Sequence, residues 1–172
     1  MAEIIFISGG ARSGKSRLAE ELARNRGEPL LYVATAQPGD AEMAARIAGH
    51  QQRRGPAWQT VEEPYELLSV IAGHDGWFQA VLVDCITLWL TNLLLSCESS
   101  AIVLEKVREL ATVAKTLHSP LILVANEVGM GIVPDNALAR QFRDLAGEAN
   151  EILAAAADEV YVMFSGLPMR LK

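Results

Sequence analysis

The sequence predicts an α/β domain with a mostly parallel central sheet flanked by helices. Five short apolar runs are rich in the β-branched residues typical of strands. None of the runs alternates between apolar and polar residues, which is expected when both faces of a strand are covered. Segments with helical periodicity lie between them, and strands that alternate with helices are typical of a parallel sheet. The five runs are residues 4–7, 30–34, 80–84, 121–125 and 160–164.

Helices are predicted in the segments between these runs. Apolar residues at a spacing of four follow the first run and predict a helix that begins near Lys15. An apolar stripe over residues 103–117 predicts another, and residues 137–157 predict a long third one. Residues 86–95 are apolar almost all round, so this segment lies either in the core or at a subunit interface.

The composition fits one domain over residues 1–172, with 51% hydrophobic residues to form a core. A net charge of −6 argues against nucleic-acid binding through a broad basic surface. Cys85 and Cys97 are expected to be small buried residues in a reducing cytoplasm. The sequence contains no recognisable signal peptide and no apolar stretch of the about 20 residues that a span needs. We therefore expect a cytoplasmic protein without stable membrane insertion.

Residues 9–16 match the pattern G-x-x-x-x-G-K-[ST] of a P-loop. The pattern follows a predicted strand and opens a predicted helix, a context that a chance glycine-rich turn would lack. Glycines let backbone amides turn toward phosphate oxygens, and the helix start adds free N–H groups. Lys15 is expected to reach β- and γ-phosphate oxygens, Ser16 to bind magnesium, and Arg12 to donate to phosphate. The predicted phosphate-binding residues are Gly9, Gly10, Ala11, Arg12, Ser13, Gly14, Lys15 and Ser16.

Asp84 ends the apolar run 80–84, where a Walker-B carboxylate is usually presented. In open parallel sheets, ligands bind beyond the carboxyl ends of the strands, so this position favours a functional role. Asp84 is a candidate magnesium ligand, directly or through water. The alternative is an N-cap for a helix that begins at Thr87. With the loop, these features predict a three-layer P-loop domain of the RecA-like kind.

A further helix is predicted over residues 40–54, with His50 at the edge of its apolar face. From periodicity alone, an edge histidine is more typical of a packed or hydrogen-bonded residue than of a catalyst. Arg53 and Arg54 shift the interpretation toward a functional role for this segment, because an arginine pair in an acidic chain is where anionic ligands would bind. Glu62, followed by a second glutamate, is either an N-terminal helix charge or a ligand acceptor.

Several segments together resemble one family, the bifunctional adenosylcobinamide kinase/adenosylcobinamide-phosphate guanylyltransferases of cobalamin biosynthesis. The resemblance runs from end to end, and the sequence N-E-V-G-M-G-I-V-P at 126–134 is much more specific than any P-loop. The other matching segments are residues 9–17 with 19–20, 32–37, 40–47 with His50, Trp58 with Glu62, 84–87 with 91–94, and 142–144.

The resemblance implies two reactions in one domain. In the first, ATP or GTP phosphorylates the aminopropanol hydroxyl of adenosylcobinamide. In the second, GMP moves from GTP onto an enzyme histidine, pyrophosphate leaves, and the GMP passes to adenosylcobinamide phosphate to give adenosylcobinamide-GDP. The resemblance also implies a homo-oligomer, with a trimer favoured.

His50 would be the guanylylated residue, aligned by its spacing from Arg46 and Ile47. Some members have two adjacent histidines where this chain has Gly49 and His50. Lys15 and the loop amides would hold phosphates. The other GTP contacts that the resemblance implies are Thr35, Ala36, Gln37, Gln51, Gln52, Arg53, Arg54, Glu62 and Asp84.

This chemistry is consistent with the residue types. A neutral imidazole is nucleophilic near pH 7 without a general base, and Arg53 or Arg54 could stabilise charge on the α-phosphate or on pyrophosphate. A P-loop ordinarily exposes the γ-phosphorus, whereas guanylylation needs attack at the α-phosphorus. The segment with His50 is therefore expected to reach across the open side of the same site, with the nucleotide bound in more than one pose.

Two other functions remain open from the sequence. A simpler P-loop kinase for a small hydroxyl substrate would leave His50 structural and form no covalent intermediate. A nucleotide-operated switch would hydrolyse GTP slowly without substrate. Against the switch, the sequence contains no N-K-x-D motif for reading guanine.

Overall fold

The computed structural model describes residues 2–37, 55–96 and 99–172. Strands and helices follow one another along the chain and end in a hairpin. In chain order the elements are β1 (Ile4–Gly9), α1 (Lys15–Arg24), β2 (Leu30–Ala34), β3 (Trp58–Glu62), α3 (Leu67–Gly73), β4 (Ala80–Asp84), α4 (Ile86–Leu95), α5 (Ser100–Ala114), β5 (Leu121–Val124), α6 (Ala137–Ala156), β6 (Glu159–Phe164) and β7 (Leu167–Arg170).

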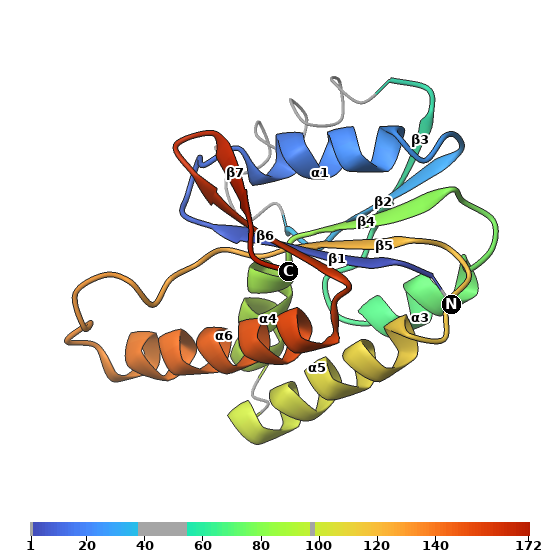
Figure 1. Ribbon diagram of the computed structural model, residues 1–172. Coiled ribbons are helices and arrows are strands. Elements are labelled where there is room, and N and C mark those ends of the chain that lie inside the picture. Colours follow the sequence, from blue (N-terminus) through green and yellow to red (C-terminus); the bar gives the residue numbers. More distant parts are fainter. Residues whose placement is uncertain (1, 38–54, 97–98) are drawn as a thin grey trace.

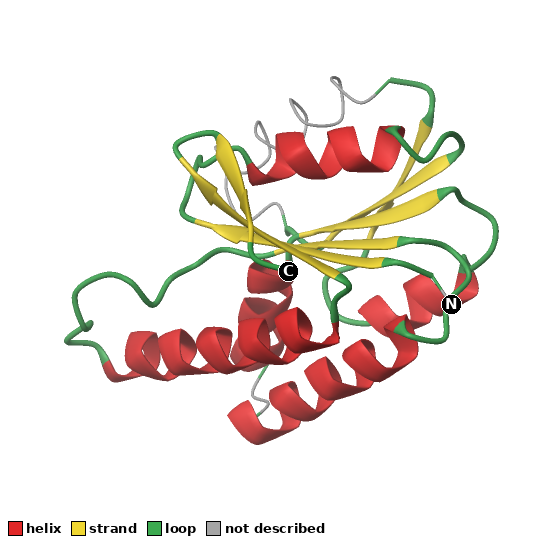
Figure 2. Cartoon of the chain, viewed as in Figure 1, coloured by secondary structure: helices red, strands yellow, loops and turns green. Residues whose placement is uncertain are grey.

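In the described part of the chain, seven strands form one sheet in the order β3-β2-β4-β5-β1-β6-β7. The strands from β3 to β6 pair in parallel, and β7 runs antiparallel to β6. Helix α1 lies on one face of the sheet, and α3, α4, α5 and α6 lie on the other (Figure 1). Figure 2 shows the resulting three layers by element type. The predicted α/β class with a mostly parallel sheet between helices is confirmed.

The central strands are buried along nearly their whole length, as the apolar runs predicted. The larger core lies between the sheet and α3 to α6 and includes Phe6, Trp89 and Leu123. The smaller core, on the α1 face, includes the fully buried Ala19 and Ala23. These two alanines let α1 approach the sheet closely, which brings the start of α1 near the strand ends.

The five strands predicted from the sequence are all present, with bounds that differ by at most two residues. Two further strands, β3 and β7, were not predicted. Both are edge strands with one neighbour each. The side chains of β7 are all exposed and those of β3 range from buried to exposed, so neither strand has the continuous apolar run of a central strand. Pro168 interrupts β7 as well, and proline is tolerated in a sheet mainly at edges.

The predicted helices are also confirmed where the structure describes them. Helices α5 and α6 begin after Ser99 and Asn136, whose side chains accept hydrogen bonds from the first turn. Helix α4 is mostly core, because Trp89, Leu90 and three other side chains of the helix are buried. No described helix is both long and apolar enough to cross a membrane.

The parallel arrangement places the carboxyl ends of six strands along one edge of the sheet. The turn after β1, the long segment between β5 and α6, and the β6–β7 turn all lie on this side, at the left of Figure 1. The described residues that are predicted to bind the nucleotide end or follow β1, β2, β3 and β4. The fold therefore supplies the common edge that these predictions required.

Candidate active site

The phosphate loop leads from the last residue of β1 to the first residue of α1. Three of its residues have positive φ: Gly9 at 147°, Arg12 at 55° and Gly14 at 96°. A Cβ atom at Gly9 would lie 2.7 Å from the carbonyl oxygen of Met163, so only glycine fits between β1 and β6. At Gly14 the left-handed conformation favours glycine and directs the chain into α1. The glycines of the pattern are therefore required by backbone geometry.

Lys15 lies inside this loop, with only 7% of its surface exposed. Its Nζ donates hydrogen bonds to the Gly10 carbonyl at 2.6 Å and to Ser13 Oγ at 3.4 Å. Burial lowers the pKa of Lys15 from its usual 10.5, while the nearby Asp84 and Cys85 oppose that shift. A poorly hydrated ammonium group at a loop rich in amide donors is well placed to bind phosphate oxygens.

Asp84 is half-buried at the carboxyl end of β4, and its Oδ2 accepts a hydrogen bond from the Tyr32 hydroxyl at 3.0 Å. The alternative role of Asp84 as a helix N-cap is wrong. Helix α4 begins at Ile86, and its N-cap is Cys85, whose Sγ accepts from the Leu88 amide at 3.5 Å. The Asp84 carboxylate is therefore left facing the phosphate loop, and its charge acts on Lys15.

One cavity of about 890 Å³ brings several predicted residues together. Ala11, Arg12, Ser13, Gly14, Lys15, Ser16 and Asp84 all line it. Gly9 and Gly10 line a neighbouring cavity, which Ala11, Arg12 and Ser13 of the loop also line. The Ser16 hydroxyl and the Asp84 carboxylate thus share one space, which an oxygen-binding cation and phosphates could occupy.

Thr35, Ala36 and Gln37 follow β2, and Glu62 ends β3. In the parallel registers, Ala34 pairs with Asp84 on one side and with Glu62 on the other. These residues therefore lie at neighbouring strand ends, on the same edge as the phosphate loop.

Thr35 differs from its neighbours in being fully buried. Its hydroxyl donates to the Cys85 carbonyl at 2.6 Å and accepts from the Cys85 amide at 2.9 Å. Its carbonyl accepts from Asn92 Nδ2 at 2.9 Å. The side chain of Thr35 thus connects β2 to the start of α4.

Of the two glutamates, Glu62 and Glu63, only Glu63 lies at the start of a helix. Glu62 lies in β3, not at a helix start, and its side chain is exposed. Glu63 Oε1 accepts from the amides of Tyr65 and Glu66 at 2.9 Å each, directly before α3. Glu63 therefore organises the entry to α3, and the role of Glu62 as a ligand acceptor stays a prediction.

The remaining predicted residues lie outside the described residues. They are His50, Gln51, Gln52, Arg53 and Arg54, together with the helix predicted over residues 40–54.

Sequence reasoning missed a charged face of α1 that lines the larger cavity. Arg17, Glu20 and Arg24 lie on this face, and Arg24 forms an ion pair with Glu20 at 3.5 Å. Their spacing of three and four residues places them on one side of the helix, so the periodicity that identified α1 could have identified them. Asn126, at the end of β5, lines the same cavity.

A parallel sheet whose first strand enters a G-x-x-x-x-G-K-S loop, with an acidic residue at the end of a strand that is separated from the first by one other strand, defines the class of P-loop α/β proteins. Within this class the sequence comparison is specific. The family model described as cobinamide kinase / cobinamide phosphate guanyltransferase matches residues 5–171. The chain belongs to this family, the CobU family of transferases.

Curated relatives agree with the family. The bifunctional adenosylcobalamin biosynthesis protein CobP of Pseudomonas aeruginosa is 45% identical, and the alignment covers 97% of this chain and 96% of the relative. The proteins named bifunctional adenosylcobalamin biosynthesis protein CobU from Escherichia coli and Salmonella typhimurium are 42% and 41% identical, each with 98% of this chain and 99% of the relative covered.

Proposed function

We propose that the chain catalyses both reactions implied by its family, acting as one catalytic domain over residues 1–172. It phosphorylates adenosylcobinamide with ATP or GTP, and then transfers GMP from GTP through a guanylyl-histidine to adenosylcobinamide phosphate. The observation that carries the proposal is the phosphate loop with its buried Lys15 opposite Asp84, in a chain that the family model matches almost completely. The cytoplasmic location expected from the sequence belongs to the same proposal.

The larger cavity is the proposed nucleotide site. The loop amides and Lys15 would bind the phosphates. The guanidinium of Arg12, which also lines this cavity, would form bidentate hydrogen bonds to them. Thr35, Ala36, Gln37 and Glu62, at the neighbouring strand ends, would meet the rest of the nucleotide. The buried Thr35 would act there by holding the strand end in place, since its hydroxyl is paired with Cys85 and its carbonyl accepts from Asn92.

Magnesium is part of this proposal. The Ser16 hydroxyl and the Asp84 carboxylate line the same cavity, and both are the hard oxygen ligands that this ion prefers. One or two protein ligands are enough, because magnesium usually completes its shell with water and nucleotide phosphates. When bound, the ion would neutralise charge on the phosphate oxygens.

In the kinase reaction, the residues around the loop mainly position the nucleotide. Phosphoryl transfer needs little covalent help from the protein, so catalysis depends on alignment and on charge stabilisation. Lys15 supplies a fixed positive charge where the β- and γ-phosphates would lie. Its hydrogen bond to the Gly10 carbonyl keeps the ammonium group inside the loop.

In the guanylyl transfer, His50 is the proposed nucleophile. A neutral imidazole nitrogen attacks the α-phosphorus of GTP, the bond to the bridging oxygen breaks, and pyrophosphate leaves. The phosphoramidate keeps the GMP activated, so the phosphate of adenosylcobinamide phosphate can then displace the histidine. Gln51, Gln52, Arg53 and Arg54 follow His50 directly and would hold the nucleotide during this transfer.

Incubation with GTP labelled at either phosphate tests this proposal. Label in the α-phosphate should remain on the denatured protein as an acid-labile adduct, and label in the γ-phosphate should not. The variant His50→Ala should lose the adduct, and His74→Ala is a matched control on a histidine of α3's C-terminal end. An adduct that persists in His50→Ala would contradict the nucleophile. Phosphorylation of cobinamide without any adduct would indicate the simpler kinase, and slow GTP hydrolysis alone would indicate the switch.

We infer in addition that the protein is a homo-oligomer, with a trimer favoured. Support comes from an apolar cavity of about 410 Å³ between the ends of α4 and α6, where Leu95 and Leu138 are exposed. Light scattering coupled to size-exclusion chromatography measures the mass directly. A monomer at micromolar concentration would contradict this inference.

A further inference from the structure

A second cavity, of about 380 Å³, lies against the phosphate loop. It shares Ala11, Arg12 and Ser13 with the larger cavity that contains Lys15, Ser16 and Asp84. The loop therefore borders two cavities, and the proposed nucleotide site accounts for only one of them. The second cavity is bounded by the end of β6 and by the segment that follows β5.

Glu127 contributes the carboxylate of this second cavity. Its backbone amide donates to the carbonyl of Gly9 at 3.0 Å, which joins the end of β5 to the phosphate loop. Its Oε1 accepts from the amide of Gly129 at 2.7 Å. A Cβ atom at Gly129 would lie 3.0 Å from this oxygen, so glycine leaves room for the carboxylate. Both the backbone and the side-chain direction of Glu127 are thus fixed relative to the loop.

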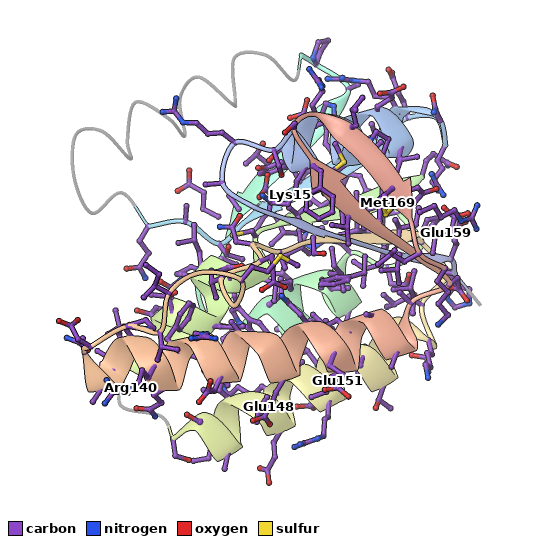
Figure 3. The ribbon with its side chains drawn as sticks, turned by 60° about the vertical axis from the view of Figure 1, so that its left-hand side comes forward. Lys15, Arg140, Glu148, Glu151, Glu159 and Met169 are labelled. Carbon is purple, nitrogen blue, oxygen red and sulfur yellow. The ribbon has the colours of Figure 1, made fainter. Side chains whose placement is uncertain are left out.

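Apolar side chains form the rim of this cavity. Met130, which is 76% exposed, comes from the segment after β5, and Phe164, which is 50% exposed, comes from the end of β6. The β6–β7 turn is attached to the phosphate loop, because the Gly166 amide donates to the Ser13 carbonyl at 3.0 Å. In Figure 3 the same hairpin, marked by Met169, stands beside the part of the molecule that contains Lys15. Large apolar side chains exposed at a cavity mouth are typical of a ligand-binding surface.

We propose that this second cavity is the acceptor site for phosphoryl transfer. Glu127 binds the acceptor hydroxyl and takes up its proton, and the rim of Met130 and Phe164 receives apolar surface of the corrinoid. In-line transfer needs the acceptor on the far side of the γ-phosphorus from the leaving group. A second cavity that adjoins the nucleotide site at Ala11, Arg12 and Ser13 offers a separate place for that acceptor. The inference rests on the proposed function and identifies where its second substrate binds.

The phosphoryl transfer needs no reactant other than the nucleotide and the acceptor hydroxyl. The hydroxyl oxygen forms a bond to the γ-phosphorus, and the bond from that phosphorus to the oxygen bridging to the β-phosphate breaks. The nucleoside diphosphate leaves with this oxygen and its electron pair. The hydroxyl proton passes to the Glu127 carboxylate and from there to water.

The first test is the variant Glu127→Gln, which keeps the size of the side chain and removes its basicity. We expect kcat for cobinamide phosphorylation to fall about 100-fold or more, the range typical for loss of a general base. Calorimetric titration with GTP and the melting temperature of each variant report on the nucleotide site and on folding. A kcat within about threefold of the unaltered protein would overturn the role of Glu127.

The second test addresses the apolar rim. Met130→Ser and Phe164→Ser should each raise KM for cobinamide by about tenfold, the effect of losing one to two kcal/mol of apolar contact. The matched control is Ile102→Ser on α5, since Ile102 has a similar exposure of 47% and lies outside the cavity. Equal KM values in all three variants would overturn the docking surface. A change of oligomeric mass in Met130→Ser or Phe164→Ser, with KM unaltered, would assign the rim to a subunit contact and also overturn it.

The unaltered protein separates this inference from the proposed function. If it fails to phosphorylate cobinamide with either nucleotide, the proposed function fails, and the acceptor site fails with it. If it is active and Glu127→Gln, Met130→Ser and Phe164→Ser are equally active, only the acceptor site is overturned.

Discussion

The hydroxyl of Thr35 and the backbone of Cys85 are joined by two hydrogen bonds, one in each direction. Thr35 Oγ1 donates to the Cys85 carbonyl at 2.6 Å, and the Cys85 amide donates to Thr35 Oγ1 at 2.9 Å. Both residues are buried, and each directly follows a strand, β2 for Thr35 and β4 for Cys85. The pair fixes the chain next to Asp84, so it holds the acidic side of the candidate site in place.

Replacing Thr35 by valine should therefore destabilise the protein. Valine keeps the shape of the side chain but leaves the buried amide of Cys85 without its partner, while the Cys85 carbonyl keeps only the hydrogen bond from the Trp89 amide. We expect the free energy of unfolding to fall by about 2–3 kcal/mol, as measured by urea denaturation. Thr35→Ser keeps the hydroxyl and serves as the control, with an expected loss of about 1 kcal/mol for the methyl group. Equal losses in the two variants would show that packing, not hydrogen bonding, stabilises this junction.

The sequence predicted the fold where burial controls the residue pattern. Central strands such as β1 and β4 are covered on both faces, and this constraint is visible as an unbroken apolar run. The edge strands β3 and β7 are not under that constraint, and their residues, which are partly exposed in β3 and fully exposed in β7, carry no comparable pattern. The pairing of β3 depends on β2, which is more than 20 residues away in sequence, and local periodicity does not report such a contact. The neighbour of β7 is β6, directly before it in the chain, but β7 is too short and too exposed to show an apolar run.

The candidate site was predictable to the extent that it follows from backbone geometry. Gly9 and Gly14 occupy conformations or contacts that exclude other residues, so the loop pattern in the sequence reflects its shape. Thr35 was expected near the nucleotide, but its internal pairing with Cys85 could not be read from the sequence. The contact joins residues 50 positions apart, and it exists only because β2 and β4 are neighbours in the sheet.

Asp75 should make stability depend on acidic pH. Desolvation raises the pKa of Asp75, but hydrogen bonds from Ser119 and from the amide and ring of His118 outweigh it and hold the pKa below its usual 3.8. A carboxyl group with a lowered pKa in the folded state stabilises the protein above the unfolded value, and this contribution is lost as the pH falls through the folded pKa. Asp75→Asn should be less stable by about 1–2 kcal/mol at pH 6, and the difference should shrink below pH 3.8.

The control for Asp75 is His118→Ala, which removes only the ring contact. The side chain of His118 is 84% exposed, so we expect a loss below about 0.5 kcal/mol at pH 6. Thermal unfolding of both variants between pH 3 and pH 7 measures the two effects. A stability difference for Asp75→Asn that is constant over this range would contradict the titration of Asp75.

Cys85 should be an unreactive thiol in the folded protein. Burial raises the pKa of Cys85 to about 12, with a further contribution from the nearby Asp84, so the reactive thiolate is scarce at neutral pH. In a Cys97→Ser background, alkylation by iodoacetamide at pH 8 should be at least about 100-fold slower in buffer than in guanidinium. The free energy of unfolding should also fall as the pH rises above the usual 9.0, because the unfolded thiol then loses its proton first. Rapid alkylation in buffer would contradict this placement of Cys85.

Replacing Lys15 by methionine should separate ligand binding from stability. Burial lowers the pKa of Lys15, which means that the folded protein holds its charge at a cost. Methionine keeps the length of the side chain and removes the charge, so the free energy of unfolding without nucleotide should change by no more than about 1 kcal/mol. Affinity for GTP, measured by calorimetry, should fall about 100-fold or more, because a charged donor to the phosphates is lost. Lys115→Met, at an exposed position after α5, is the control and should alter neither quantity. A Lys15→Met protein that binds GTP as tightly as the control would place the phosphates away from this loop.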